Sequence, residues 1–227
     1  MAMWRKAIAE LIGTAALIFI GAGSIVMNQY TNGGVGLVGI ALAHGLTIGV
    51  MVSCVGHISG GHLNPAVTAG FLATGRMSLR DGVWYIGSQL IGGVLGAVLL
   101  QACFPPAALA AANFGTPLLA PGVSVSAGVI IELVLTFLLV FTVFATAVDP
   151  QGAFKSIAGY GIGTIVTIDI LAGGPLTGAS MNPARTFGPA VVGNIWTHHL
   201  VYWVGPIAGG VLAGLLYHNL FLHGRRK

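Results

Sequence analysis

The chain has 227 residues, of which 56% are hydrophobic and only 6% are charged. A soluble domain carries roughly 25% charged residues, so this composition excludes an ordinary soluble protein and indicates an integral membrane protein. The formal net charge of +4 comes from basic residues near the chain ends and between apolar segments, and no patch that would bind nucleic acid is evident.

Six apolar segments follow one another along the chain, each near the ~20 residues that a helix needs to cross a bilayer. They are residues 7–28, 35–56, 83–103, 124–146, 156–173 and 199–222. Two further segments, 64–75 and 182–193, are long enough for only about half a crossing. We therefore expect an all-α membrane protein with six transmembrane helices and two re-entrant half-helices, forming a single transmembrane domain over residues 1–227.

The basic residues predict the orientation of the chain. Apart from Arg185 they occur at the chain ends and in the second and fourth connections between spans: Arg5, Lys6, Arg76, Arg80, Lys155, Arg225, Arg226 and Lys227. With six spans these positions share one side, so the positive-inside rule places both termini in the cytoplasm. We expect no cleaved signal peptide and no appended soluble domain, and the short termini favour the plasma (inner) membrane.

Three motifs occur twice, in the same order and at nearly one offset. "SGGHLNPAV" (59–67) recurs as "TGASMNPAR" (177–185), "GGVLGA" from Gly92 recurs as "GGVLAG" from Gly209, and "ELIGT" from Glu10 recurs as "ELVLT" from Glu132. Each half holds three spans, which is an odd number, so the second copy must enter the membrane from the opposite face. The sequence therefore predicts inverted repeats, about 7–103 and 124–222, with a site near the bilayer midplane.

The two Asn-Pro pairs predict where the half-helices begin, because Asn is a preferred N-cap and Pro suits the first helical position. The two triplets are Asn64, Pro65 and Ala66, and Asn182, Pro183 and Ala184. If both N-termini meet at mid-membrane, their positive dipole ends repel cations. The Asn amides can donate to a passing water, whose hydrogens then point away, and this arrangement interrupts a proton-relay chain.

These motifs resemble those of the aquaporins, the major intrinsic protein family, over essentially the whole chain. The resemblance is carried by "HISGGHLNPAV", "GASMNPARTFGPAVV", "YWVGPIAGG" and the paired Glu10 and Glu132. It implies a homotetramer in the lipid bilayer with one pore per subunit, passive conduction of small neutral solutes, and no cofactor. No metal cluster and no pair of nucleophile and base is evident, so we do not expect an enzyme.

By the same resemblance, an outer constriction is formed by His44, Ile170, Ala179 and Arg185. This set is similar to that of tonoplast intrinsic proteins and of aquaporin eight. Strict water channels of this family have histidine at the position of Ile170, so isoleucine removes a polar side chain from the constriction. They have phenylalanine at the position of His44, so the imidazole restores a donor or acceptor on another wall. We therefore expect a channel for water, ammonia and hydrogen peroxide that excludes protons and ions. A water-selective channel without ammonia flux and a small-solute secondary transporter remain alternatives.

Other residues are expected to line or brace the pore. Placing a charged side chain such as Arg185 within the membrane costs free energy, which indicates a function. We expect Arg185 to offer hydrogen-bond donors to the permeant and to exclude cations. Glu10 and Glu132 are expected to brace the strands that lead into the half-helices, and Asp169 to point away from the lumen. Asn113 or Phe114 is expected to approach the filter. The further pore-lining residues predicted are His62, Gly60, Gly61, Gly178 and Ser180.

Overall fold

The computed structural model describes residues 1–152 and 157–222. Within these residues six helices are long and apolar enough to cross a membrane, which confirms the predicted number of spans. They are Met3–Tyr30, Gly36–Ser59, Leu79–Cys103, Val125–Val148, Ala158–Thr177 and Val201–Leu222. The described part contains helices and connections but no strand, so the predicted all-α class is also confirmed.

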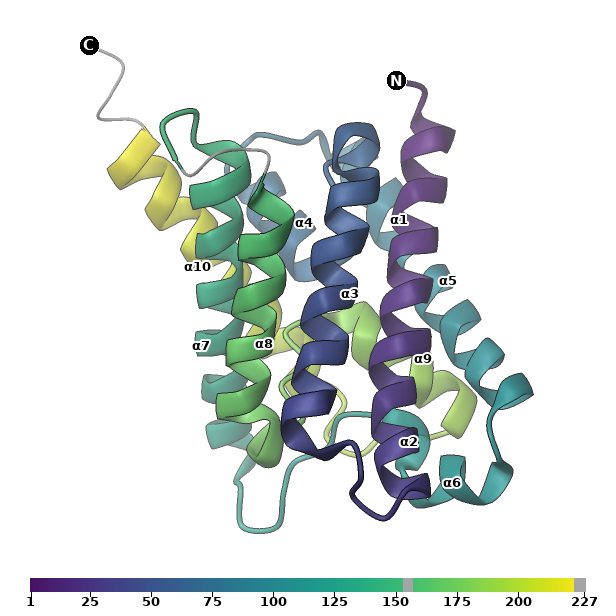
Figure 1. The fold of residues 1–227 in the computed structure, drawn as a ribbon. Coiled ribbons are helices and arrows are strands. Elements are labelled where there is room, and N and C mark those ends of the chain that lie inside the picture. The colour runs from purple at the N-terminus through teal and green to yellow at the C-terminus, as the bar shows by residue number, and fades with distance from the viewer. Residues whose placement is uncertain (153–156, 223–227) are drawn as a thin grey trace.

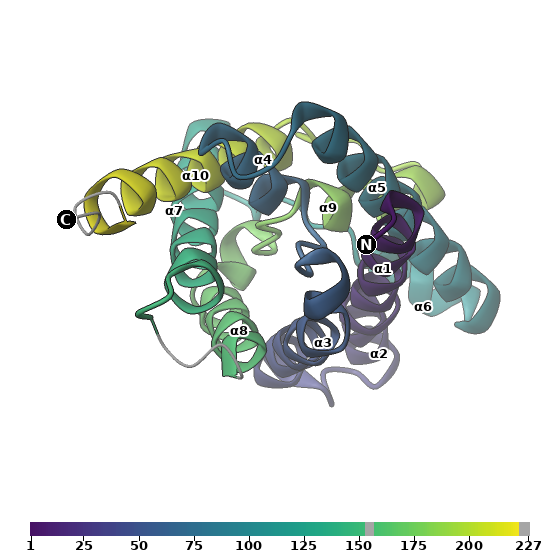
Figure 2. The same cartoon turned by 90° about the horizontal axis from the view of Figure 1, so that it is seen from above.

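Several spans are continued by a turn of π-helix. The first span joins α1 (Met3–Leu17), a π-helical turn (Ile18–Ala22) and α2 (Gly23–Tyr30). The other spanning helices are α3 (Gly36–Ser59), α5 (Leu79–Cys103), α7 (Val125–Val143), α8 (Ala158–Thr177) and α10 (Val201–Tyr217). Helix α6 (Pro106–Ala111) and a 3₁₀ turn (Asn113–Gly115) lie in the long connection between α5 and α7. Viewed along their axes, the spanning helices form a ring (Figure 2).

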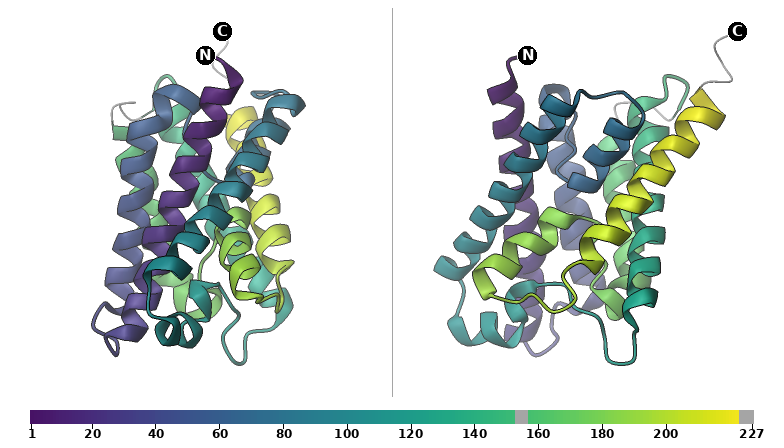
Figure 3. Two further views of the ribbon diagram at one scale, coloured as in Figure 1. Left: turned by 90° about the vertical axis from the view of Figure 1, so that its right-hand side faces the viewer. Right: turned by 180° about the vertical axis from the view of Figure 1, so that it is seen from behind.

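The two half-helices enter this ring from opposite ends. Helix α4 (Pro65–Ala73) and helix α9 (Pro183–Gly193) each begin at the predicted proline. Their first turns face each other near the middle of the bundle (Figure 3). Each half-helix packs against the last span of the other half, α4 against α10 and α9 against α5. The two halves of the chain are therefore interlocked.

Two glycines on the last spans permit this close packing. A Cβ atom added to Gly93 would lie 2.6 Å from the carbonyl oxygen of Ala184, and one added to Gly210 would collide with the carbonyl oxygen of Ala66. Both alanines are fully buried. The third residue of each Asn-Pro-Ala triplet therefore packs against a neighbouring helix backbone, and a larger side chain would push the half-helix away.

The chain begins and the last described helix ends at the same end of the bundle (Figure 1), which we call the inner end; the opposite end is the outer end. The connection from α4 to α5, which carries Arg76, and the first turn of α5, which carries Arg80, also lie at the inner end. Lys155, Arg225, Arg226 and Lys227 lie outside the described residues. The described basic residues near the N-terminus, between α4 and α5 and in the first turn of α5 thus lie at one end of the bundle, as the even number of spans predicts.

Candidate pore

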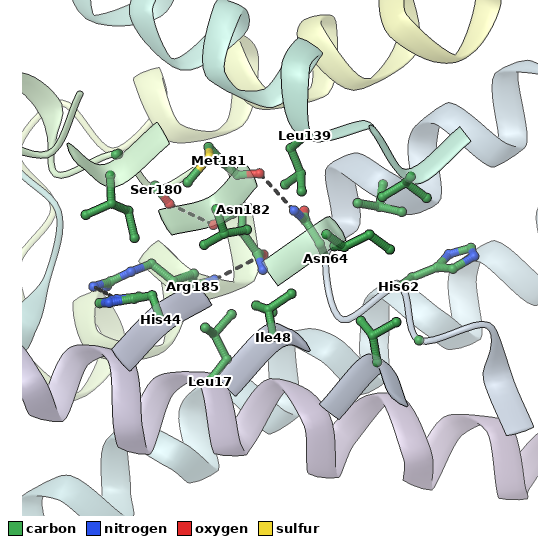
Figure 4. A pocket seen from close by; sticks show the side chains of 18 residues that line it. Leu17, His44, Ile48, His62, Asn64, Leu139, Ser180, Met181, Asn182 and Arg185 are labelled. Atoms are coloured by element: carbon green, nitrogen blue, oxygen red, sulfur yellow. Dashed lines mark hydrogen bonds between the residues drawn. The ribbon is translucent and has the colours of Figure 1, made fainter. Parts of the chain in front are cut away.

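A narrow cavity runs through the centre of the bundle where the half-helices meet (Figure 4). Its walls are mostly apolar and come from α1, α3, α7 and α8, with members such as Leu17, Ile48, Leu139 and Val166. Its polar lining consists of His44, His62, Asn64, Ser180, Asn182 and Arg185. A permeant in this cavity therefore meets a short series of polar groups on an otherwise apolar surface.

The two asparagines sit at the centre of the cavity and cap the half-helices. Asn64 Oδ1 accepts from the backbone N–H of Ala66 at 2.8 Å, and Asn182 Oδ1 accepts from those of Ala184 and Arg185 at 3.0 and 3.2 Å. The predicted helix starts are thus confirmed. Both dipole N-termini point toward the centre, where they favour negative charge and disfavour cations.

The amide nitrogens of the asparagines link the two halves, which the sequence did not reveal. Asn64 Nδ2 donates to the carbonyl oxygen of Met181 at 2.8 Å, and Asn182 Nδ2 donates to that of Leu63 at 2.9 Å. Each amide group has two N–H bonds, so one is committed to the opposite strand and one is left for a permeant. The cross-links hold the two helix tips at a fixed separation.

Two buried glutamates brace the irregular segments 60–63 and 178–181 that precede the half-helices and that we call the leading strands, although they pair in no sheet. Glu10 accepts from the backbone N–H groups of His62 and Leu63 at 3.0 and 2.6 Å. Glu132 accepts from those of Ser180 and Met181 at 2.9 and 2.7 Å. These strands contain left-handed residues whose N–H groups have no helical partner. The carboxylates supply acceptors for those groups and thereby hold the strand carbonyls in place.

The predicted outer constriction is brought together at one end of the cavity, where His44, Ile170, Ala179 and Arg185 all contribute to the lining. Arg185 donates from Nη1 to the carbonyl oxygen of Gly115 at 2.7 Å and from Nη2 to Nε2 of His44 at 3.0 Å. The guanidinium is therefore held from two sides. Its Nε is buried and has no hydrogen-bond partner among the described residues.

His44 differs from the expectation drawn from the sequence. Its Nδ1 lies 2.8 Å from the carbonyl oxygen of Ile40, which can only accept, so Nδ1 carries the proton. Nε2 is then the acceptor for Arg185. The expectation that His44 offers a donor or acceptor to the permeant is therefore wrong in this structure. Both ring nitrogens are engaged within the protein, and the imidazole serves to position Arg185.

The long outer connection reaches the constriction through a backbone atom. Neither Asn113 nor Phe114 lines the cavity; the contact to Arg185 is made by the carbonyl oxygen of Gly115. All three residues have positive φ, between 48° and 68°, so the chain turns sharply here. Phe114 packs beside Gly193 at the end of α9. A backbone contact of this kind leaves no signal in the residue types.

Of the other residues expected in the lining, Gly61, His62 and Ser180 border the cavity. Gly60 does not border it, and Gly178 lines an adjoining outer cavity that shares His44 and Ile170 with it. The two glycines end α3 and α8 as left-handed C-caps with φ of 93° and 83°, a conformation that glycine adopts without steric cost. Asp169 is buried away from the cavity lining, and its Oδ2 has no hydrogen-bond partner in the described part of the chain.

Across residues 1–152 and 157–222, no cluster of three or more His, Cys, Asp or Glu side chains is arranged to hold a metal ion. Six spans around a cavity in which two helix N-termini meet define the class of membrane-embedded transport proteins, which includes channels. Each polar group of the cavity either holds a neighbouring residue in place or can form a hydrogen bond with a molecule in the cavity.

The chain belongs to the major intrinsic protein family, whose model matches residues 1–217. It is 49% identical over 225 residues to Aquaporin TIP4-4 of Zea mays, covering 96% of this chain and 87% of that protein. It is 45% identical over 225 residues to Aquaporin TIP1-1 of Arabidopsis thaliana, covering 96% and 88%. These relatives are channels and not enzymes. The protein is thus a multi-pass passive channel of the kind that conducts water.

The fold is shared with a solved structure. The X-ray structure of the aquaglyceroporin from Plasmodium falciparum superposes with a TM-score of 0.84, covering 96% of this chain and 97% of that chain. The two sequences are 24% identical, so this likeness concerns the architecture alone. The predicted arrangement of six spans with two re-entrant half-helices is therefore confirmed at the level of the fold.

Proposed function

We propose that the protein conducts ammonia and hydrogen peroxide as well as water, and that it excludes protons and ions. The observation that carries this proposal is the hydrogen bonding of the outer constriction. Because both nitrogens of His44 are engaged, and Ile170 and Ala179 are apolar, the ring offers hydrogen bonds chiefly from Arg185. A ring that is polar on one side replaces little of a permeant's hydration, so it admits small neutral molecules and rejects ions, whose hydration costs most to remove.

Proton exclusion is proposed from the centre of the cavity. The remaining N–H group of each asparagine and the two helix N-termini orient a water with its oxygen toward the tips. Its hydrogens then point outward in both directions, so a chain of water molecules cannot relay a proton through the centre. Arg185 adds a positive charge to this field and opposes cations.

A secondary transporter is the alternative from another class, and it would need a carboxylate free to bind the coupling ion. In this structure both oxygens of Glu10 and of Glu132 accept hydrogen bonds from backbone or side-chain donors. Binding an ion would break the strands that these groups brace. Asp169 has one oxygen without a hydrogen-bond partner among the described residues, but it lies outside the cavity lining. The engaged glutamates and the position of Asp169 support the channel over the transporter.

The proposal is tested with the purified protein in liposomes. Stopped-flow light scattering measures water permeability, and a luminal pH dye reports ammonia influx as alkalinisation. We expect both rates to exceed those of empty liposomes, and the ammonia flux to rise linearly with concentration without a gradient of H⁺ or Na⁺. Alkalinisation no faster than in empty liposomes would leave the water-selective channel as the function, whereas flux that saturates and requires an ion gradient would favour the transporter.

We further propose that the protein is a single channel domain built from inverted repeats, about 7–103 and 124–222, with both termini in the cytoplasm. The opposite entry of α4 and α9 supports the inverted arrangement (Figure 3). The sequence favours the plasma membrane, whereas the relatives are tonoplast-type aquaporins. Imaging a fluorescent fusion beside markers of both membranes separates these two locations.

A further inference from the structure

The end of the cavity opposite Arg185 presents one polar side chain, His62 (Figure 4). Its ring packs against Phe71 and Tyr85, with centroid distances of 4.3 and 5.1 Å. Its backbone N–H donates to Glu10 at 3.0 Å. The residue is 7% exposed, and the two aromatic neighbours leave little freedom for the ring to turn.

One nitrogen of this ring lies in a closed hydrogen-bond group. His62 Nδ1 lies 3.1 Å from Thr68 Oγ1. The same hydroxyl lies 3.1 Å from the carbonyl oxygen of Asn64 and 3.1 Å from Nε2 of Gln89. Gln89 Nε2 in turn donates to Glu10 at 2.8 Å. Thr68 is fully buried, so no water competes for its hydroxyl.

Counting protons decides the tautomer of His62. The Thr68 hydroxyl has one proton, and the carbonyl oxygen of Asn64 can only accept. If Thr68 donates to that carbonyl, it can accept from Gln89 and from an N–H at Nδ1 of His62, and all three contacts are hydrogen bonds. If Thr68 instead donates to His62, its contact with Asn64 is lost. The carbonyl oxygen of Asn64 also accepts the backbone N–H of Thr68 at 3.0 Å, so it has a partner in both arrangements, but the first arrangement forms three hydrogen bonds at the Thr68 hydroxyl and the second only two. The first is therefore favoured by one hydrogen bond.

The second half of the chain provides an internal comparison. The position equivalent to His62 is Ser180, which pairs with Thr186 at 2.5 Å, as His62 pairs with Thr68. The position equivalent to Gln89 is Pro206, which has no side-chain donor. Tyr85 and Tyr202, which flank these two positions, bond to equivalent carbonyls in both halves. The extra donor is therefore present only in the half that holds an imidazole.

We propose that Thr68 and Gln89 are positioning residues that hold His62 as the tautomer protonated at Nδ1, so that Nε2 is an acceptor for permeants at the inner end of the pore. No hydrogen bond to Nε2 is formed within the described residues, and His62 borders the cavity. The pore then offers donors at Arg185 and the asparagines and an acceptor at His62. A water or ammonia molecule that moves from the centre toward the inner end has its hydrogens directed toward that end, and Nε2 accepts a hydrogen bond from one of them. This inference rests on the proposed function only in taking the cavity as the conduction path.

The tautomer is measured by solid-state NMR of the full chain in lipid bilayers, labelled with ¹⁵N-histidine. Spectra recorded at pH 8, above the ordinary histidine pKa of about 6.5, distinguish a protonated Nδ1 from a protonated Nε2. Loss of one signal set in His62→Phe assigns the residue. We expect a single Nδ1–H tautomer in the wild type, a mixture in Thr68→Val, and the wild-type pattern in Thr68→Ser, which keeps the hydroxyl.

Flux measurements test the role of the acceptor. We expect the water permeability of Thr68→Val to be about fivefold below the wild type, the effect of one lost hydrogen bond, and Thr68→Ser to restore it. Thr142→Val is the matched control, because Thr142 also bonds its hydroxyl to a carbonyl one turn back, at 2.9 Å, but lies outside the cavity lining; its permeability should not change.

An Nε2–H tautomer or a charged ring in the wild type, or an unchanged tautomer in Thr68→Val, would overturn the inference. So would full water permeability in a Thr68→Val protein that shows mixed tautomers. These outcomes are independent of ammonia conduction. A wild type with the expected tautomer but no ammonia flux would contradict only the proposed permeant.

Discussion

His44 and Arg185 act as one unit at the outer constriction. The backbone of Ile40 and the guanidinium of Arg185 use both nitrogens of the imidazole, while Gly115 holds the other side of the guanidinium. A buried guanidinium that loses these acceptors keeps N–H groups without hydrogen-bond partners, which is destabilising. The precision of the ring therefore depends on His44 even though His44 offers the permeant no hydrogen bond.

Moving the histidine of the constriction from position 44 to position 170 tests whether these two residues set the selectivity. In His44→Phe with Ile170→His, we expect the new histidine at position 170 to replace His44 as the acceptor for Arg185, and the phenyl group to narrow the ring. We expect ammonia permeability to fall about fivefold and water permeability to stay within about twofold of the wild type. A fivefold change corresponds to the net free energy of roughly one hydrogen bond, by which the variant ring favours water over ammonia. Both are measured in liposomes. Ile170→Val, which stays apolar, is the control, and unchanged ammonia flux in the double variant would show that these residues do not set the selectivity.

The packing of the half-helices on the opposite spans gives a prediction for α5. A methyl group on Gly93 would lie 2.6 Å from the carbonyl oxygen of Ala184 and would displace the first turn of α9 together with Asn182. We expect Gly93→Ala to lower water permeability at least about tenfold, because small misplacements of a site are costly. Gly87→Ala on the same helix is the matched control, since no atom lies within 4 Å of the added methyl group. Equal permeability of the two variants would contradict the packing argument.

An aromatic cluster joins the outer end of α9 to the start of α10. His199 lies between Trp196, at a centroid distance of 4.9 Å, and Phe187, at 6.3 Å, and its Nε2 accepts from the indole N–H of Trp203 at 3.0 Å. An indole nitrogen can only donate, so this bond requires Nε2 to be unprotonated. Burial also lowers the pKa of His199 below its ordinary value of 6.5.

This contact predicts a pH dependence of stability. Because the folded state lowers the pKa of His199, the unfolded state binds more protons below about pH 6.5. The contribution of His199 is therefore complete above pH 6.5 and is lost as the pH falls toward the lowered folded pKa. We expect the thermal midpoint of the purified protein to fall between pH 7.5 and pH 5, and the fall to be smaller in His199→Gln, whose amide oxygen can accept from Trp203 at either pH. An equal fall in both proteins would contradict the assignment.

For the whole molecule, the surface between α3 and α8 predicts how subunits associate. A groove there is lined by the exposed side chain of Leu46 and lies where Gly45 and Gly163 pack α3 closely against α8. Small residues allow close approach of helices in membranes. Native mass spectrometry of the 23.1 kDa chain should show a tetramer, and Leu46→Trp should lower its proportion. Leu95→Trp, on the exposed face of α5, should leave the tetramer intact; equal effects would argue against this groove as the interface.

Much of the architecture is readable from local properties of the chain. The six spans follow from the length of the apolar segments, and the half-helices follow from the Asn-Pro caps at residues 64–65 and 182–183. The recurrence of these caps together with Glu10 and Glu132 indicates the pairing of the two halves. Each of these features depends on hydrophobicity, capping or spacing within a short stretch, so neighbouring residues are sufficient to specify it.

The contacts that shape the pore depend instead on segments distant in the chain. Asn64 bonds to Met181 across 117 residues, and Arg185 bonds to Gly115 and His44 across 70 and 141 residues. Two of these acceptors are backbone carbonyls, which every residue possesses, so no residue type indicates them. The sequence placed His44 at the constriction, but packing determines which of its nitrogens remain free. For this reason the residues of the pore could be named from the sequence, whereas their donors and acceptors emerged only when the two halves were brought together in space.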